Sequence, residues 1–185
     1  NVIMKELLLG FDPISLDEMS GIKLMNRTDT KFITTLARLE ELLVKAQEQY
    51  WIQDIDGNRN MPYFTRYFDT PECHMYVMHQ NGKKTRQKVR IRSYESSGLV
   101  FIEVKNKNNH GRTKKKRISL ENRDVERELY YDFLCQHLTY NPNRLVTQIE
   151  NNFNRITLVN KQKTERLTID TGLRFNNIVT GNNMS

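Results

Sequence analysis

The sequence contains little cysteine and no long apolar run. Its two cysteines, Cys73 and Cys135, are too few for a disulfide framework and fit a reduced, cytoplasmic protein. Apolar segments such as Ile3–Leu9 and Leu39–Val44 are far shorter than the ~20 residues that span a bilayer. There is also no cationic start followed by an apolar run and a small-residue cleavage site, so no signal peptide is expected. We therefore expect a cytoplasmic chain without a transmembrane segment.

Positive charge is in excess over negative charge. The 185 residues include 29 Lys and Arg against 22 Asp and Glu, which gives a formal charge of +7 and a pI of about 9.4. Such a balance favours anionic partners such as phosphates, nucleic acid or acidic lipid. Net charge alone does not distinguish these partners. The positions of the cations along the chain are needed to distinguish them.

The hydrophobic pattern predicts an α+β fold with mostly antiparallel strands. Alternation predicts strands over Gly21–Thr34, Met61–Thr70, three segments of Lys88–Leu120, Phe153–Asn160 and Glu165–Phe175. Helical signals predict a short helix with Ser15 as N-cap and Glu18 three residues later, and helices over roughly Thr35–Gln49, Pro71–Gln80 and Glu121–Leu138. Since no repeat or linker is present, we expect one domain, 1–185, with a core of about 21–176.

Charged side chains share one face of each predicted strand, because successive side chains of a strand point to opposite sides. The other face is aliphatic, as in Val89 and Ile91 or Ile102 and Val104, and the amphipathic helices are available to cover it. The charged face collects many cations and few acids: Lys31, Lys88, Arg90, Arg92, Lys105, Lys115, Arg117, Arg155 and Arg166 against Asp29, Glu103 and Asp170.

Two interpretations of this charged face stand side by side. A half-buried antiparallel sheet ordinarily has a polar face toward water. Solvated faces usually mix both signs, however, because like charges directly opposite each other destabilise a ladder. The concentration of cations is therefore better explained by a polyanion that compensates it, bound on the face or inside a barrel.

Several motifs resemble, in order and spacing, those of the VTC domain. They are "NRTDTKF", "YFDTPE", "KVRIRSY", "FIEVKNK", "KKKRISL" and "ERLTIDTGLRF", and the resemblance covers about Met25–Phe175. This domain is the polyphosphate-polymerase branch of the triphosphate tunnel metalloenzymes, which include the CYTH phosphatases. The resemblance implies an antiparallel β-barrel, or triphosphate tunnel, with amphipathic helices packed outside. It also implies ATP and polyphosphate or another triphosphate as ligands, with a divalent metal, Mn or Mg.

The resemblance assigns roles to the charged residues. It implies a catalytic set of Lys31, Arg90, Arg92, Lys105, Arg155 and Arg166, further phosphate-binding residues Lys88, Lys115 and Arg117, and metal candidates Glu103, Asp170 and Asp29. For each acid the alternative is an ordinary salt bridge across the strands. Asp69 in "YFDTP" is either part of the site or a turn or cap residue before the helix that follows.

Two departures from the family pattern matter. CYTH members begin with two alternating glutamates and a lysine, whereas this chain has Arg27, Asp29 and Lys31, as in the polymerase branch. The family also has a late strand with a metal-binding glutamate, and no such motif follows Asp170. Either the sequence is incomplete after Ser185 or the barrel closes differently.

These features predict an enzyme that moves the terminal phosphate of ATP onto a polyphosphate chain. The first alternative is a CYTH-type triphosphatase, and the second is a non-catalytic module that binds polyphosphate or nucleic acid. Nucleic acid is not expected, because base stacking needs exposed aromatics among the cations. Tyr94 and Phe101 flank the basic strands, but the basic faces carry almost no others. A place in a larger membrane-associated assembly is left open.

Overall fold

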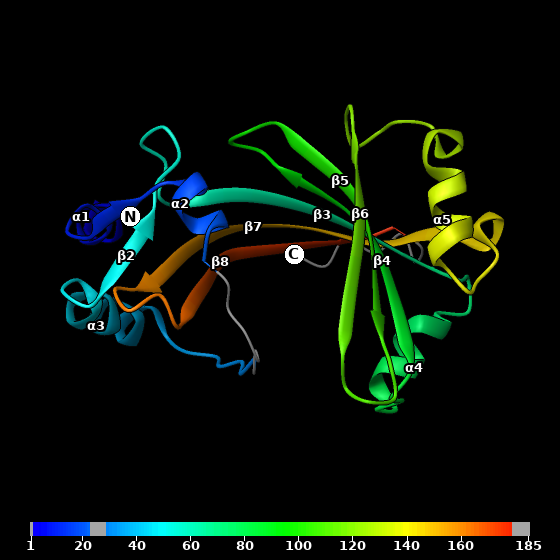
Figure 1. Cartoon of the computed structure of the whole chain (residues 1–185), viewed down its shortest axis with the longest axis horizontal. Coiled ribbons are helices and arrows are strands. Elements are labelled where there is room, and N and C mark those ends of the chain that lie inside the picture. Colours follow the sequence, from blue (N-terminus) through cyan, green and yellow to red (C-terminus); the bar gives the residue numbers. More distant parts are fainter. Residues whose placement is uncertain (1, 23–28, 179–185) are drawn as a thin grey trace. The chain divides into compact units, whose positions relative to one another are not determined.

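The computed structural model in Figure 1 describes residues 2–22 and 29–178. The chain forms two compact units, one built from Asn1–Met61 and Arg155–Thr171 and the other from Pro62–Asn154 and Gly172–Ser185. Strands β7 (Val146–Asn160) and β8 (Arg166–Asn177) pair with each other and contribute to both units. Among the described residues, no helix is long and apolar enough to cross a membrane. The single domain 1–185 stays a prediction.

The first unit packs short helices on a small sheet. Its complete elements are α1 (Val2–Leu9), β1 (Asp12–Ile14), α2 (Leu16–Ser20), α3 (Leu36–Ala46) and β2 (Tyr50–Gln53). Strand β2 pairs in parallel with β1 and antiparallel with the end of β7. Helix α3 buries Leu39 and Leu43 in a cluster with Ile52 and Leu158. The predicted cap of α2 is confirmed, because Ser15 Oγ accepts a hydrogen bond of 3.1 Å from the Glu18 N–H.

The strand predicted over Gly21–Thr34 is wrong for the part that the structure describes. Residues 29–34 belong to no strand, so Asp29 and Lys31 do not lie on one. The neighbouring side chains of Phe32 and Ile33 are 86% and 104% exposed, whereas a half-buried strand would hide one of two successive residues. Arg27 lies outside the described residues.

The second unit is built on an antiparallel sheet. Its neighbouring strands are, in order, β7, β3 (Met61–Asp69), β4 (Arg86–Tyr94), β5 (Leu99–Lys107) and β6 (Thr113–Leu120). Tight turns link the last three strands, which are green in Figure 1, as the sequence predicted. At the first turn, Gly98 has a φ of +71°, a conformation that glycine adopts without strain. The α+β class is confirmed, and the closed barrel stays a prediction.

One face of this sheet is aliphatic and lies in the hydrophobic core of the unit. Val89 and Ile91 of β4 and Ile102 of β5 are at most 1% exposed. They cluster with Met75 of α4 (His74–Gln80) and with Leu134 of α5 (Tyr131–His137). The predicted separation of an aliphatic face from a charged face is therefore confirmed for these strands. The remaining elements of the unit are the 3₁₀ helices η1 (Arg127–Tyr130) and η2 (Pro142–Arg144).

The helix predicted over Glu121–Leu138 is too long at its start, since helical structure begins at Arg127. A distant residue accounts for the difference. The guanidinium of Arg66 donates to the carbonyl of Arg123 at 2.6 Å and to the carboxylate of Asp124 at 3.0 Å. These bonds hold the preceding segment in a non-helical conformation against β3.

The helix predicted from Pro71 begins at His74, and Asp69 caps it. The buried carboxylate of Asp69 accepts hydrogen bonds from the N–H groups of Met75 and Tyr76, both at 2.9 Å, and from that of Thr70 at 2.7 Å. Cys73 lies between them with a positive φ of 56°. Of the two interpretations of Asp69, the structure supports the cap.

Candidate phosphate-binding face

The register of β4, β5 and β6 brings cations together in rows across the second unit. Lys88, Lys105 and Lys115 lie opposite one another, and the next row is formed by Arg90, Glu103 and Arg117. A third row begins with Arg92, which lies opposite Phe101. We call the side chains of these rows the charged face: Lys88, Arg90, Arg92, Glu103, Lys105, Lys115 and Arg117.

Glu103 lies at the centre of the charged face and is 1% exposed. Its Oε2 accepts a hydrogen bond of 2.8 Å from Arg90 Nε, and Lys115 Nζ lies 3.6 Å from its Oε1. Burial opposes ionisation, yet the attraction and hydrogen bond of Arg90, with a further contribution from Lys115, hold the pKa of Glu103 below its usual range. Glu103 is therefore a buried carboxylate anion surrounded by cations.

The pKa of Lys115 reflects both its burial and the charges of its neighbours. Burial lowers the pKa of Lys115 and the attraction of Glu103 opposes this, while repulsion by Arg90, Arg117 and Arg92 lowers the pKa further. The net effect is a pKa below the usual value. A bound anion would offset the part of this lowering that comes from the three arginines.

Arg92 differs from Arg90 in its surroundings. Its guanidinium carbon lies 5.7 Å from the ring centroids of both Tyr63 and Phe153, and its Nε donates a hydrogen bond of 3.4 Å to Thr65 Oγ1. The residue is 6% exposed. Contact with two aromatic faces in a dry environment stabilises a guanidinium strongly and fixes its position.

Aromatic rings gather beside the cations, contrary to the expectation that the basic faces carry almost none. Tyr94 packs edge-on against Tyr63 at 4.8 Å and against Phe101 at 5.9 Å. The guanidinium of Arg117 lies 4.2 Å from the Phe101 ring centroid. Strand parity would have placed Tyr63 and Thr65 beside the charged face once β3 was paired with β4, because Thr65 lies opposite Arg92 and Tyr63 lies opposite Tyr94, two positions from Arg92.

The other predicted site residues belong to the first unit. Arg155 donates two hydrogen bonds, of 2.7 and 2.9 Å, to the two carboxylate oxygens of Asp170. Arg166 is an exposed residue of β8, and Asp29 and Lys31 lie in the exposed segment described above. The structure thus brings Arg155 and Asp170 together in the first unit and the seven residues of the charged face together in the second.

The predicted metal ligands do not form a cluster in residues 2–22 and 29–178, where no three His, Cys, Asp or Glu side chains are grouped as a metal would require. Glu103 Oε1 is a buried oxygen without a hydrogen bond, but its nearest charged neighbours are cations, which repel a metal ion. Both oxygens of Asp170 are occupied by Arg155. The divalent metal therefore stays a prediction, and these carboxylates do not fit a resident ion.

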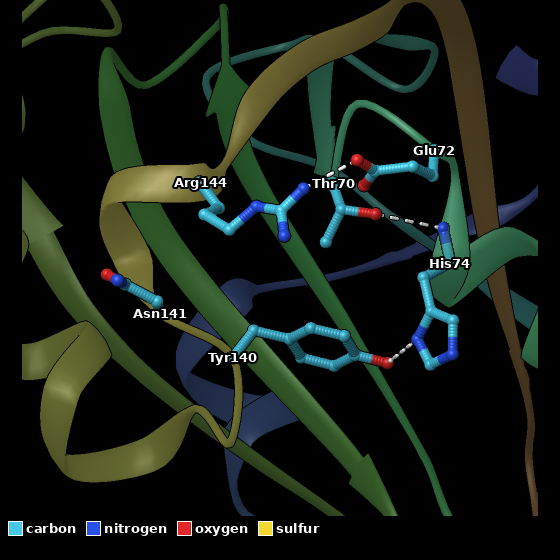
Figure 2. A pocket seen from close by; sticks show the side chains of 6 residues that line it. All are labelled: Thr70, Glu72, His74, Tyr140, Asn141 and Arg144. Carbon is cyan, nitrogen blue, oxygen red and sulfur yellow. Dashed lines mark hydrogen bonds and ion pairs between the residues drawn. The ribbon is translucent and has the colours of Figure 1, made fainter.

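A pocket of about 400 Å³ lies in the second unit away from the charged face (Figure 2), and it is lined by Thr70, Glu72, His74, Tyr140, Asn141 and Arg144. Its charged and aromatic groups already bond to one another. Arg144 pairs with Glu72, and the ring of His74 shares a 2.7 Å hydrogen bond with the hydroxyl of Tyr140. The pocket has no excess of positive charge, and none of its residues is a predicted site residue.

The fold and the charged face define a class of protein, an α+β domain whose antiparallel sheet carries a face rich in cations. The VTC domain family model matches residues 26–184. The chain therefore belongs to the VTC domain family, which is associated with polyphosphate synthesis. No curated protein matches the chain.

Proposed function

We propose that the charged face binds the phosphates of ATP and of a growing polyphosphate chain, and that the domain transfers the terminal phosphoryl group of ATP to that chain. The observation that carries the proposal is the row of three lysines beside the row of Arg90 and Arg117. One carboxylate, Glu103, is set among six cations. Membership of the VTC domain family supports the same ligand class.

The chemistry requires little beyond positioning and charge neutralisation. Phosphoryl transfer spreads negative charge over the equatorial oxygens of the moving group, and fixed cations stabilise that charge. The bond from the γ-phosphorus to the β-phosphate oxygen of ATP breaks while one to the terminal oxygen of the acceptor chain forms, and ADP leaves. Arginine can form bidentate hydrogen bonds with a phosphate group, whereas lysine supplies point charges along the polyphosphate chain. We propose that Mn or Mg arrives bound to the nucleotide as part of the substrate.

The closed tunnel belongs to the same proposal. The catalytic roles of Lys31, Arg155 and Arg166 also remain part of this proposal. Cytoplasmic localisation and a role in a larger membrane-associated assembly are also kept as predictions.

A triphosphatase is the main rival, because the same cations would stabilise attack by water on ATP or inorganic triphosphate. Purified protein incubated with ATP and Mn separates the two functions. We expect long-chain polyphosphate and ADP, and orthophosphate as the sole phosphate product would refute the polymerase.

Variants connect this activity with the charged face. Arg90→Ala should lower tripolyphosphate affinity about tenfold or more, as expected when a charged hydrogen-bond partner is lost. Arg144→Ala is the matched control, since it also removes one guanidinium but from the pocket of Figure 2. Equal affinities for Arg90→Ala, Arg144→Ala and the unmodified protein would refute the assignment of the charged face. A nucleic-acid module would instead bind single-stranded oligonucleotides more tightly than tripolyphosphate.

A further inference from the structure

Arg90 is bonded to Glu103 through only one of its guanidinium nitrogens, Nε. Arg90 Nε donates the 2.8 Å hydrogen bond, and no other partner of Arg90 is found among the residues that the structure describes. The side chain of Arg90 is 23% exposed, whereas that of Glu103 is 1% exposed. The guanidinium is therefore held through Nε by a buried group, and its two Nη groups have no partner in residues 2–22 and 29–178.

The two Nη groups form the end of the fork that meets two phosphate oxygens at once. A long side chain loses rotamer entropy when it is fixed, so an arginine that is already held binds a phosphate more tightly than a mobile one. Glu103 can provide this hold because it is buried in β5 and flanked by both neighbouring strands.

We propose that Glu103 is a positioning residue, which fixes Arg90 through Nε so that the Nη groups face two oxygens of one phosphate. The proposal rests on the proposed function, because it concerns the same phosphate-binding face. It assigns Glu103 a role different from that of a metal ligand. It also predicts that arginine at position 90 gives a higher phosphate affinity than lysine only when residue 103 can fix the guanidinium.

The positioning effect of Glu103 can be distinguished experimentally from the effect of its negative charge on anion binding. Replacing Glu103 removes a negative charge and should itself strengthen anion binding, whichever cation occupies position 90. Arg90→Lys keeps the positive charge but loses the fork. We therefore compare, in each background at position 103, the tripolyphosphate affinity with arginine at position 90 and that with lysine. The charge of residue 103 affects both affinities nearly equally, so it largely cancels in their ratio. The ratio then measures how much residue 103 contributes by fixing the guanidinium.

The experiment measures tripolyphosphate binding by calorimetry, in EDTA and at fixed ionic strength, for the full chain. With Glu103 present, Arg90→Lys should weaken binding about tenfold. In the Glu103→Gln background, the same substitution should weaken it by about threefold or less, because the neutral amide is a poorer acceptor. Glu103→Asp serves as a second test, since it keeps the charge but shortens the reach, and it too should reduce the ratio.

Glu150→Gln is the matched control. Glu150 accepts a 2.7 Å hydrogen bond from the Nε of Arg66, so it forms the same kind of pair away from the charged face. In this background the tenfold effect of Arg90→Lys should persist. An unchanged ratio in both Glu103 variants would overturn the positioning role while leaving the proposed function intact. If the unmodified protein fails to bind tripolyphosphate, the proposed function fails and this inference fails with it.

Discussion

Arg92→Lys should destabilise the second unit, although it conserves charge. The guanidinium of Arg92 lies 5.7 Å from each of two ring centroids, those of Tyr63 and Phe153, and the residue is 6% exposed. A dry cation–π contact contributes about 1–2 kcal/mol, and the compact ammonium of lysine does not replace a guanidinium that lies near both rings. We therefore expect the free energy of unfolding to fall by about 2 kcal/mol.

Urea unfolding followed by far-ultraviolet circular dichroism measures this loss. Arg90→Lys is the matched control, because it makes the same exchange two residues along β4 at a side chain that is 23% exposed. Its hydrogen bond to Glu103 can be replaced by a lysine ion pair, so the expected cost is about 1 kcal/mol or less. If Arg92→Lys and Arg90→Lys lower the free energy of unfolding equally, the argument that the aromatic rings stabilise Arg92 more strongly than Glu103 stabilises Arg90 is refuted.

Three further predictions concern groups whose environment the structure defines. Asp69→Ala should lower the free energy of unfolding by about 2 kcal/mol in urea, since it uncaps α4 and leaves buried N–H groups without an acceptor. The hydrogen bond to Glu165, with burial, raises the pKa of Tyr50 to about 12 from 10.0, so its stabilising contribution should be lost between pH 10.0 and about 12. Tyr50→Phe should remove this late ionisation from the ultraviolet titration. The lowered pKa of Glu103 makes its contribution full above about pH 4.5 and lost as the pH falls through the folded-state pKa, so Glu103→Gln should flatten this acid limb of the stability curve.

The elements that the sequence predicted well are those governed by local pattern. In Lys88–Leu120 the side chains alternate and short turns join neighbouring strands, so parity alone separates Val89 and Ile91 from Arg90 and Arg92. Helix α3 has apolar residues at helical spacing and Thr35 at its cap, where Oγ1 accepts from the Arg38 N–H. In each case neighbouring residues carry the necessary information.

The helix start that was predicted wrongly and a strand that was missed both depend on distant partners. Residues 121–126 have helical periodicity, but Arg66 binds the Arg123 carbonyl from 57 positions away. Strand β1 has three residues and pairs in parallel with β2, which a local pattern does not reveal. The role of Glu103 likewise depended on register, since its hydrogen bond to Arg90 follows from the pairing of β4 with β5.

The two arginines of "RIR", Arg90 and Arg92, are equivalent in sequence but not in structure, and this difference predicts where a phosphate chain should bind. Arg92 lies near the rings of Tyr63 and Phe153 and is 6% exposed, so its guanidinium offers little surface to a phosphate. Arg90 keeps an open Nη edge, and the exposed lysine row that contains Lys88 and Lys105 begins one row away. A phosphate chain should therefore lie over the rows of Arg90 and Lys88, with Arg92 contributing a fixed positive potential from beneath the aromatic cluster. On this argument, Arg90→Lys should weaken tripolyphosphate binding more than Arg92→Lys does, while the order of their effects on stability is the reverse.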